Sequence, residues 1–397
     1  MSPQRIKEIS VTPIPAHYRK ELGKNAYADN RGTQWLEWVV RARTDQGVEG
    51  ITLASRFMRE SSVQSLLDTL REVFMGRPVD DLLNISGGRV TGPGAPVARA
   101  FEQHGWMSIL AYDLVGRVNG VSCVDLLGGR VRDSVPAYDT TLYFQDFLDP
   151  EKGPVKAAEE AAEARRAGYR QAKIKVGRGG RWMLPEAGMR RDVDVVLAIR
   201  EAVGPDFTLM VDGNFGYDGH LDLLDDFIRE TVPAGIFWLE EMITHDLDGY
   251  RAIREMQARH GSKALLTCGE VDRTPISTTF RYLIEDGLID GYQPDIVAQG
   301  FSTWQRIERE LAGAGVRSIP HNFGNGCFGT YASLAFGAAS ETFASIEDER
   351  CVPHVFTPAH RFENGSYVVG DAPGLGVEID EEKFQSKYAA NEFKVTG

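Results

Sequence analysis

Ionisable side chains recur at regular intervals from residue 175 onward in this 397-residue sequence. Each ends or directly follows a short apolar segment, and successive steps along the chain are 37, 28, 30, 25, 26 and 26 residues. The residues are Lys175, Asp212, Glu240, Glu270, Asp295, His321 and Glu347. Each step is close to one strand-and-helix unit, and the carboxyl ends of barrel strands share one face. We therefore expect these side chains to converge on one cavity.

Three of the carboxylates form a candidate metal site. Asp212, Glu240 and Glu270 end three successive apolar segments. Three anions in one small space repel unless a cation holds them, and an all-oxygen set suits Mg²⁺ better than Zn²⁺. Strand alternation allows only one of Glu240 and Glu241 to face inward, and the alternation does not choose between them. The alternative is three unrelated strand-end carboxylates, which the joint spacing disfavours.

Lys173, Lys175, Asp295, His321 and Glu347 are candidates for proton transfer. The two lysines are two residues apart, so on a strand they face the same way, although this pattern also occurs on solvated surfaces. Neighbouring ammonium groups and a divalent cation lower the pKa of a lysine, which can then act as a base near neutral pH. Asp295 beside His321 fixes the imidazole tautomer and raises its pKa. Glu347, if kept protonated, can donate a hydrogen bond to a developing oxyanion.

The elements that position these groups alternate regularly. Strands are expected at 138–144, 172–176, 208–212, 236–240, 265–270, 291–295, 317–321 and 343–347. The clearest helix is expected over 154–167, closed by Gly168. Eight such units predict a (β/α)8-type barrel over residues 131–350. A doubly wound sheet is disfavoured because no glycine-rich first turn is present.

The two ends of the chain differ from the barrel. Residues 1–130 predict an α+β domain with strands at 5–12, 35–43 and 48–53 and helices at 62–74 and 97–118. Residues 351–397 lose the alternation and are expected to pack back on that domain. The stretch 17–32 is polar, basic and aromatic, which fits either a solvated surface loop or a substrate lid. Its candidate substrate-binding residues are Arg19, Lys20, Tyr27 and Arg31.

Composition limits the class of partner. There are 44 basic and 57 acidic residues, a net charge of −13, which argues against nucleic acid and anionic membranes but allows a small anionic substrate. No apolar run reaches the roughly 18 residues of a membrane span, and the first residues lack the apolar region of a signal peptide. The four cysteines lie far apart, as is usual in a reduced cytoplasmic enzyme. We therefore expect a cytoplasmic location.

The ordered set of motifs resembles the enolase superfamily, within it the mandelate racemase subgroup. The motifs are Leu126-Leu127-Gly128-Gly129-Arg130, K-x-K, D-x-N, Glu-Glu, Gly-Glu and a later Asp and His. The resemblance covers nearly the whole chain. It implies an α/β fold in which the barrel carries an N-terminal α+β capping domain completed by the C-terminal segment, and a dimer or dimer-based octamer.

The resemblance also implies roles for individual residues. Asp212, Glu240 and Glu270 match the Mg²⁺ ligands of the family, which favours the first glutamate of the pair. Lys175 matches the base on one face of the substrate, and Lys173 matches the residue that tunes it and touches the substrate carboxylate. Asp295–His321 matches the acid/base pair on the opposite face, and Glu347 the group that hydrogen-bonds a carboxylate oxygen. Asn214 is a polar contact near the metal, and Arg56 a specificity candidate on a second capping loop.

The implied activity is that of a Mg²⁺-dependent acid-sugar dehydratase. Such an enzyme removes the proton α to a carboxylate through an enediolate and eliminates the β-hydroxyl, giving a 2-keto-3-deoxy acid. The alternatives are a racemase, epimerase or cycloisomerase, or a barrel that binds sugar acids without turnover. A zinc hydrolase is set aside because the first expected strand carries no His-x-His. Met242 and Phe215-Gly216-Tyr217 depart from the family pattern and bear on specificity.

Overall fold

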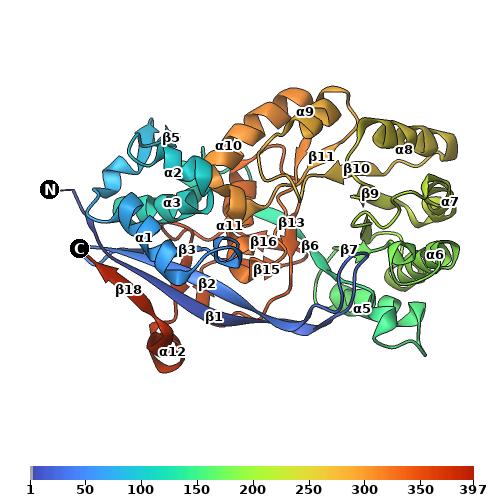
Figure 1. Ribbon diagram of the computed structural model, residues 1–397, viewed down its shortest axis with the longest axis horizontal. Coiled ribbons are helices and arrows are strands. Elements are labelled where there is room, and N and C mark those ends of the chain that lie inside the picture. The colour runs from blue at the N-terminus through green and yellow to red at the C-terminus, as the bar shows by residue number, and fades with distance from the viewer. Residues whose placement is uncertain (1–2) are drawn as a thin grey trace.

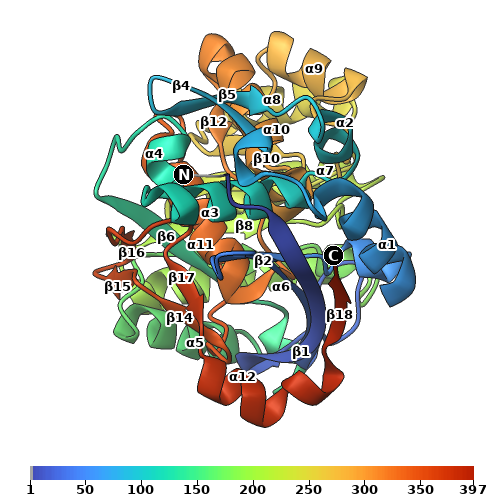
Figure 2. The same cartoon turned by 90° about the vertical axis from the view of Figure 1, so that its left-hand side faces the viewer.

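The computed structural model describes residues 3–397, which form a capping sheet and a parallel β/α barrel. The capping sheet is antiparallel, with strand order β18-β1-β2-β3. Its strands are β1 (Ile6–Leu22), β2 (Gly32–Thr44), β3 (Glu49–Leu53) and β18 (Phe393–Thr396). Figures 1 and 2 show this sheet and its helices on one side of the molecule and the barrel on the other.

The barrel consists of eight strands joined in sequence order and closed by pairing of its last strand with its first. The strands are β6 (Ser134–Leu142), β7 (Gln171–Lys175), β8 (Thr208–Asp212), β9 (Ile236–Glu240), β10 (Leu265–Cys268), β11 (Gly291–Tyr292), β12 (Arg317–Ser318) and β13 (Ile346–Asp348). A parallel bridge between Ser318 and Phe343 joins β12 to the segment that leads into β13. The predicted barrel fold is confirmed.

A helix follows each of the first seven barrel strands. These helices are α5 (Pro154–Arg166), α6 (Pro185–Val203), α7 (Leu221–Thr231), α8 (Leu247–His260), α9 (Thr278–Glu285), α10 (Ile296–Ala314) and α11 (Gly326–Ala339). Ala172 and Ile174 of β7 pack in a buried cluster with Ala157 and Ala161 of α5. Because side chains alternate along a strand, this outward packing turns the intervening Lys173 away from the helices.

The capping helices differ from the prediction at one point. α1 (Val63–Phe74) begins after Ser62, whose side chain accepts a hydrogen bond from the Ser65 amide, as a helix N-cap does. The single helix expected over 97–118 is wrong: α2 (Ala98–Gln103) and α3 (Trp106–Asn119) are separate. A Cβ atom at Gly105, between them, would overlap the backbone carbonyl of Gln299 in α10. The helix is interrupted at His104, which has φ of −137° and ψ of 73°, and the absence of a side chain at Gly105 lets the capping helices pack closely on the barrel.

The stretch 17–32 is strand at its start and loop over most of its length. β1 continues to Leu22 and β2 begins at Gly32, so residues 23–31 lie outside both strands. This hairpin reaches from the capping domain to the barrel beside α5 (Figure 1).

The C-terminal segment contacts both parts of the molecule. β18 pairs with β1 and completes the capping sheet, as predicted. β14 (Phe356–Pro358) pairs with β17 (Val377–Ile379), and α12 (Glu381–Lys387) follows. The hairpin of β15 (Arg361–Glu363) and β16 (Ser366–Val368) adds antiparallel to the start of β6. No helix within residues 3–397 is both long and apolar enough to cross a membrane.

Candidate active site

Three carboxylates meet at the carboxyl ends of the central barrel strands. Asp212 and Glu240 are the last residues of β8 and β9, and Glu270 follows β10. One oxygen atom of each lies within 4.8 Å of the others. Asp212 and Glu240 are buried, whereas the side chain of Glu270 is 20% exposed. Three hard oxygen donors with one side open to solvent suit Mg²⁺, which keeps several of its water ligands.

The structure places Glu240, not Glu241, in this triad. Glu241 is buried in a left-handed backbone conformation with φ of 43°. Its Oε1 lies 3.3 Å from His245 Nε2 and accepts from the Gly269 amide at 3.4 Å. Glu241 therefore supports the chain just before Glu270 instead of joining the triad.

Two buried lysines of β7 contact the triad from one flank. Lys173 Nζ lies 2.6 Å from Glu240 Oε1 and 2.9 Å from Glu347 Oε1, while Lys175 donates to Asp212. Burial lowers the pKa of both lysines, but the carboxylates outweigh it and hold each pKa above its ordinary value. The direction is opposite to the one expected from the lysine pair alone. A divalent cation bound by the triad would compete with the two lysines for the negative charge of Asp212 and Glu240.

The Asp295–His321 pair flanks the triad on the other side. A parallel bridge joins the two residues, and His321 Nδ1 lies 3.1 Å from Asp295 Oδ2. His321 Nε2 lies 3.5 Å from Glu270 Oε1, so the imidazole reaches from its carboxylate partner to the triad. Burial lowers the pKa of His321, but Glu270, Glu347 and Asp295 outweigh it and raise the pKa to about 9. An imidazole so placed can donate a proton at neutral pH.

The contacts of Glu347 favour its ionised form, in contrast to the protonated acid considered from the sequence. Its Oε1 accepts from Thr140 Oγ1 at 2.7 Å, and its Oε2 accepts from the Asn322 amide at 2.7 Å. Burial raises the pKa of Glu347, but Lys173, His321 and these hydrogen bonds hold it well below its ordinary value. In this arrangement Glu347 orients Lys173 and the loop that follows His321.

Several groups around the site were missed by the sequence prediction. Gln293 Nε2 donates to Glu240 Oε2 at 2.8 Å, and Asn325 Nδ2 donates to Asp295 Oδ2 at 2.8 Å. Gln293 lies two residues before Asp295, the same spacing as the lysine pair, so strand parity was a usable signal for it. The predicted Asn214 is buried, and its backbone N–H donates to Asp212 Oδ1 at 2.9 Å. Its side-chain oxygen has no hydrogen-bond partner among residues 3–397.

The capping domain brings arginines to this site. Arg56 Nη2 lies 2.6 Å from Asp295 Oδ2 and 3.4 Å from His321 Nδ1. Arg31 Nη2 donates to the Tyr27 hydroxyl at 3.0 Å, and its guanidinium lies 5.7 Å from the centroid of the Phe323 ring. The structure thus brings Arg31 and Arg56 to the barrel mouth, with Tyr27 beside Arg31.

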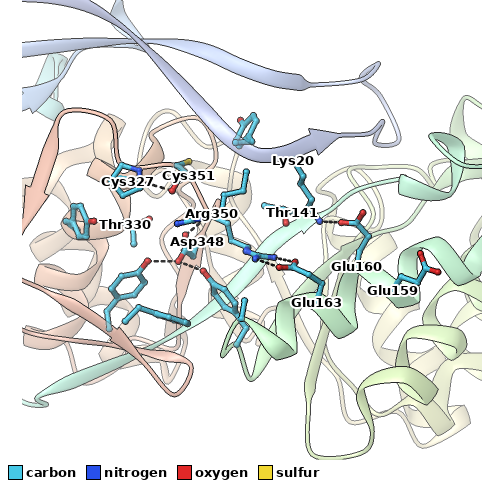
Figure 3. A pocket seen from close by; sticks show the side chains of 18 of the residues that line it. Lys20, Thr141, Glu159, Glu160, Glu163, Cys327, Thr330, Asp348, Arg350 and Cys351 are labelled. Carbon is cyan, nitrogen blue, oxygen red and sulfur yellow. Dashed lines mark hydrogen bonds and ion pairs between the residues drawn. The ribbon is translucent and has the colours of Figure 1, made fainter. Parts of the chain in front are cut away.

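Arg19 and Lys20 do not reach the site, contrary to the prediction. They line a separate cavity of about 700 Å³ between β1, α5 and the C-terminal hairpin. Lys20 points to Glu160 of α5 there, and Arg350 pairs with Glu163 nearby (Figure 3). The reason is that residues 17–22 continue β1, which carries this part of the chain past the barrel mouth.

Comparison with known proteins gives the family. The family model described as Enolase C-terminal domain-like matches residues 156–383. D-galactarolactone cycloisomerase of Agrobacterium fabrum is 30% identical over 307 residues, which is 70% of this chain and 71% of that protein. D-gluconate dehydratase of Thermoproteus tenax is 26% identical over 305 residues, which is 74% of this chain and 58% of that protein.

A solved structure extends the likeness to the whole chain. The E234A mutant of galacturonate dehydratase from Geobacillus sp., complexed with Mg, superposes with a TM-score of 0.85 at 26% identity and covers 99% of this chain and 97% of that one. The fold, the carboxylate triad and these matches lead to one conclusion. The chain belongs to the enolase superfamily, as an enzyme of the mandelate racemase/muconate lactonizing subgroup.

Proposed function

We propose that this enzyme is a Mg²⁺-dependent acid-sugar dehydratase that forms a 2-keto-3-deoxy acid. One observation carries the proposal: the carboxylate triad lies between a lysine on β7 and an acid/base pair at the ends of β11 and β12. Dehydration needs a base that removes the α-proton and an acid that protonates the departing β-hydroxyl, and these two groups must reach the substrate from different positions. Two relatives described above are sugar-acid dehydratases, which supports the same reaction class.

Asp212, Glu240 and Glu270 would hold the Mg²⁺ ion. When bound, the ion supplies electrostatic stabilisation of the second negative charge that forms on the substrate carboxylate after α-proton loss. The donor set fits, because all three ligands are carboxylates and Gln293 and Lys173 fix the orientation of Glu240.

The remaining steps belong to side chains of this chain. Lys173 binds the substrate carboxylate, and Glu347 and Glu240 keep its ammonium group in place. Lys175, in its neutral form, removes the α-proton from the β7 side, and a cation held by Asp212 would favour that form by weakening the pull of Asp212 on the lysine proton. His321 donates its Nε2 proton to the departing β-hydroxyl, while Asp295 holds Nδ1 and so fixes which nitrogen faces the substrate. Burial of these groups excludes bulk water from the reacting carbons.

A cycloisomerase is the second candidate, because a relative at 30% identity is D-galactarolactone cycloisomerase. The same base and the same acid would then move protons without loss of water. The two activities differ in the mass of the product.

The test is mass spectrometry of a sugar-acid and sugar-lactone library incubated with Mg²⁺ in D₂O. A dehydratase gives a product lighter by one water. A product of unchanged composition that carries deuterium contradicts dehydration and indicates the cycloisomerase, a racemase or an epimerase. In His321→Gln we expect deuterium at the α-carbon to persist while water loss falls about 100-fold or more, since general acid catalysis contributes about 10²–10⁴-fold.

A further inference from the structure

Three arginines of the capping domain, hereafter the cap arginines, stand over one loop of the barrel. Arg31 lies in the loop before β2, and Arg56 and Arg59 lie at the two ends of the short 3-10 helix η1 (Phe57–Arg59) that follows β3. Arg56 contacts Asp295 and His321, and Arg31 lies near the ring of Phe323. The Arg59 guanidinium lies 3.5 Å from where a Cβ atom of Gly324 would be. The cap arginines therefore converge on loop 321–325, on the His321 side of the site.

This convergence lies at the accessible edge of an otherwise closed site. Lys173, Asp212 and Glu240 are at most 1% exposed. The side chains of Glu270 and Arg56 are 20% and 31% exposed, and Arg59 is an exposed residue. The exposed edge of the site therefore holds Glu270 and the cap arginines together, and a ligand that enters at this edge would meet the cap arginines with its outer end.

Some hydrogen-bond donors of the cap arginines have no acceptor in the described part of the chain. The Nε atoms of Arg31 and Arg56 are buried and have no hydrogen-bond partner among residues 3–397. Arg59 forms no ion pair with a carboxylate within residues 3–397. Partial desolvation of its guanidinium, with Arg56 and Arg31 nearby, lowers the pKa of Arg59. Buried donors without acceptors are costly, and three neighbouring guanidinium groups repel one another. Both features indicate a missing anionic partner.

We propose that the cap arginines bind a second anionic group, so that the substrate is a sugar acid charged at both ends, such as an aldaric acid. This inference rests on the proposed function, because it places the reacting carboxylate at the triad. A guanidinium fork matches a carboxylate or a phosphate by paired hydrogen bonds, and both groups share this chemistry.

Binding rather than turnover gives the first test. Tartrate and glycerate are hydroxy acids that differ in the presence of a second carboxylate, and their affinities for the Mg²⁺-loaded protein are measured by calorimetry. We expect tartrate to bind about 10- to 100-fold more tightly, the range that hydrogen bonds to charged groups provide. Equal affinities for the two acids would overturn the proposal.

Variants then assign the difference to the arginines. Arg59→Gln should lower the tartrate-to-glycerate ratio at least about 5-fold, and Arg59→Lys should lower it less because the charge remains. Arg31→Gln is a second, independent variant for the case in which Arg59→Gln does not fold. Arg71→Gln removes an exposed arginine of α1 in the same domain and controls for long-range charge. A ratio that falls equally in Arg71→Gln also overturns the proposal.

Turnover measurements show whether the second anionic group is a carboxylate or a phosphate. They also test the anion subsite separately from the proposed dehydratase activity. An aldonic acid, the aldaric acid of the same configuration and the terminally phosphorylated aldonic acid are compared by kcat/KM. Preference for the aldaric acid supports the carboxylate subsite, and preference for the phosphorylated acid assigns the same subsite to phosphate. Preference for the aldonic acid, whose far end is uncharged, overturns the proposed anion subsite. Arg59-dependent tartrate binding without water loss from any acid would refute the dehydratase and leave the anion subsite standing.

Discussion

Arg56 Nη2 lies 2.6 Å from Asp295 Oδ2, so a side chain of the capping domain holds the carboxylate of the barrel's acid/base pair. The same oxygen accepts from Asn325 Nδ2 at 2.8 Å and lies 3.1 Å from His321 Nδ1. Burial raises the pKa of Asp295, but Arg56 and His321 outweigh it and lower the pKa to about 2. These contacts favour the ionised form of Asp295, and its position depends on how the capping domain docks on the barrel.

Replacing Arg56 should therefore affect turnover as well as binding. In Arg56→Gln we expect kcat to fall about 10-fold or more, since hydrogen bonds between charged groups contribute about 1.5–3 kcal/mol. Steady-state kinetics on the best monocarboxylic substrate separates kcat from KM. Arg56→Lys should recover part of kcat, and Arg71→Gln is the matched control. A raised KM with unchanged kcat would show that Arg56 binds substrate without positioning the pair.

Lys175→Ala tests the proposed base. Exchange of the α-proton with D₂O, followed by NMR, should fall by about 10²–10⁴-fold because general base catalysis contributes that much. Circular dichroism and the melting temperature show whether the variant keeps its fold. Lys156→Ala on α5 is the control, because Lys156 pairs with Glu160 away from the barrel mouth. Unchanged exchange in Lys175→Ala would remove this residue as the base.

Asp212→Asn tests the metal site. The substitution removes a charged oxygen ligand but keeps the shape of the side chain, so Mg²⁺ affinity should fall about 10-fold or more. Calorimetric titration of the metal-free protein measures the affinity directly. In the parent protein, Mg²⁺ at about 100 times its dissociation constant should stabilise the fold by about 2.7 kcal/mol. Asp218→Asn, at an exposed aspartate bonded to Thr244, is the control, and equal Mg²⁺ affinity in Asp212→Asn would exclude Asp212 as a ligand.

The barrel part of the site was predictable because it follows local rules. One ionisable residue per strand-and-helix unit, together with strand parity, is enough to bring Lys175, the triad and His321 to one face. Strand parity does not show what each group contacts. The lysine pair alone predicts lowered pKa values, whereas contact with Asp212, Glu240 and Glu347 raises them.

The capping contribution was harder to predict because it depends on how two parts of the chain dock. Arg19 and Lys20 lie in the same basic stretch as Arg31, yet the extension of β1 carries them to a different cavity. Arg59 gives no signal in the sequence, since only the docking of its turn places it over Gly324. Contacts between residues more than 200 positions apart, such as Arg56 and Asp295, have no local pattern.

Glu349 should make stability depend on pH. This buried carboxylate accepts from the amides of Asn325 and Gly326 at the start of α11. Burial, with Glu347 and Glu37 nearby, raises its pKa from 4.5 to about 8 despite these hydrogen bonds. The folded state therefore binds the proton more tightly than the unfolded state, so stability is lost as pH rises from about 4.5 to 8. The loss is at most about 5 kcal/mol, at about 1.4 kcal/mol for each pKa unit.

Glu349→Gln should remove this contribution. The amide oxygen still accepts from the α11 amides but does not titrate, so the unfolding midpoint should fall less steeply between pH 5 and 8 than in the parent. Urea denaturation at several pH values measures the slope, and Glu363→Gln at the exposed β15 strand is the control. Identical slopes in parent and Glu349→Gln would mean that Glu349 is ionised in the folded protein.

Two glycine substitutions of opposite expected sign test the docking of the capping helices on the barrel. Gly105 packs against the carbonyl of Gln299, so Gly105→Ala inserts a methyl group where no space exists. Overpacking of this kind costs about 1–3 kcal/mol. Gly313 lies exposed near the end of α10 with nothing within 4 Å of an added Cβ, so Gly313→Ala should stabilise the protein by up to about 1 kcal/mol. Denaturant unfolding measures both changes.

The Gly105→Ala substitution should also affect turnover. Because Arg56 reaches Asp295 only when the capping domain is docked on the barrel, Gly105→Ala should lower kcat, whereas Gly313→Ala should leave kcat unchanged. A Gly105→Ala enzyme with normal stability and normal kcat would refute the close approach of Gly105 to α10.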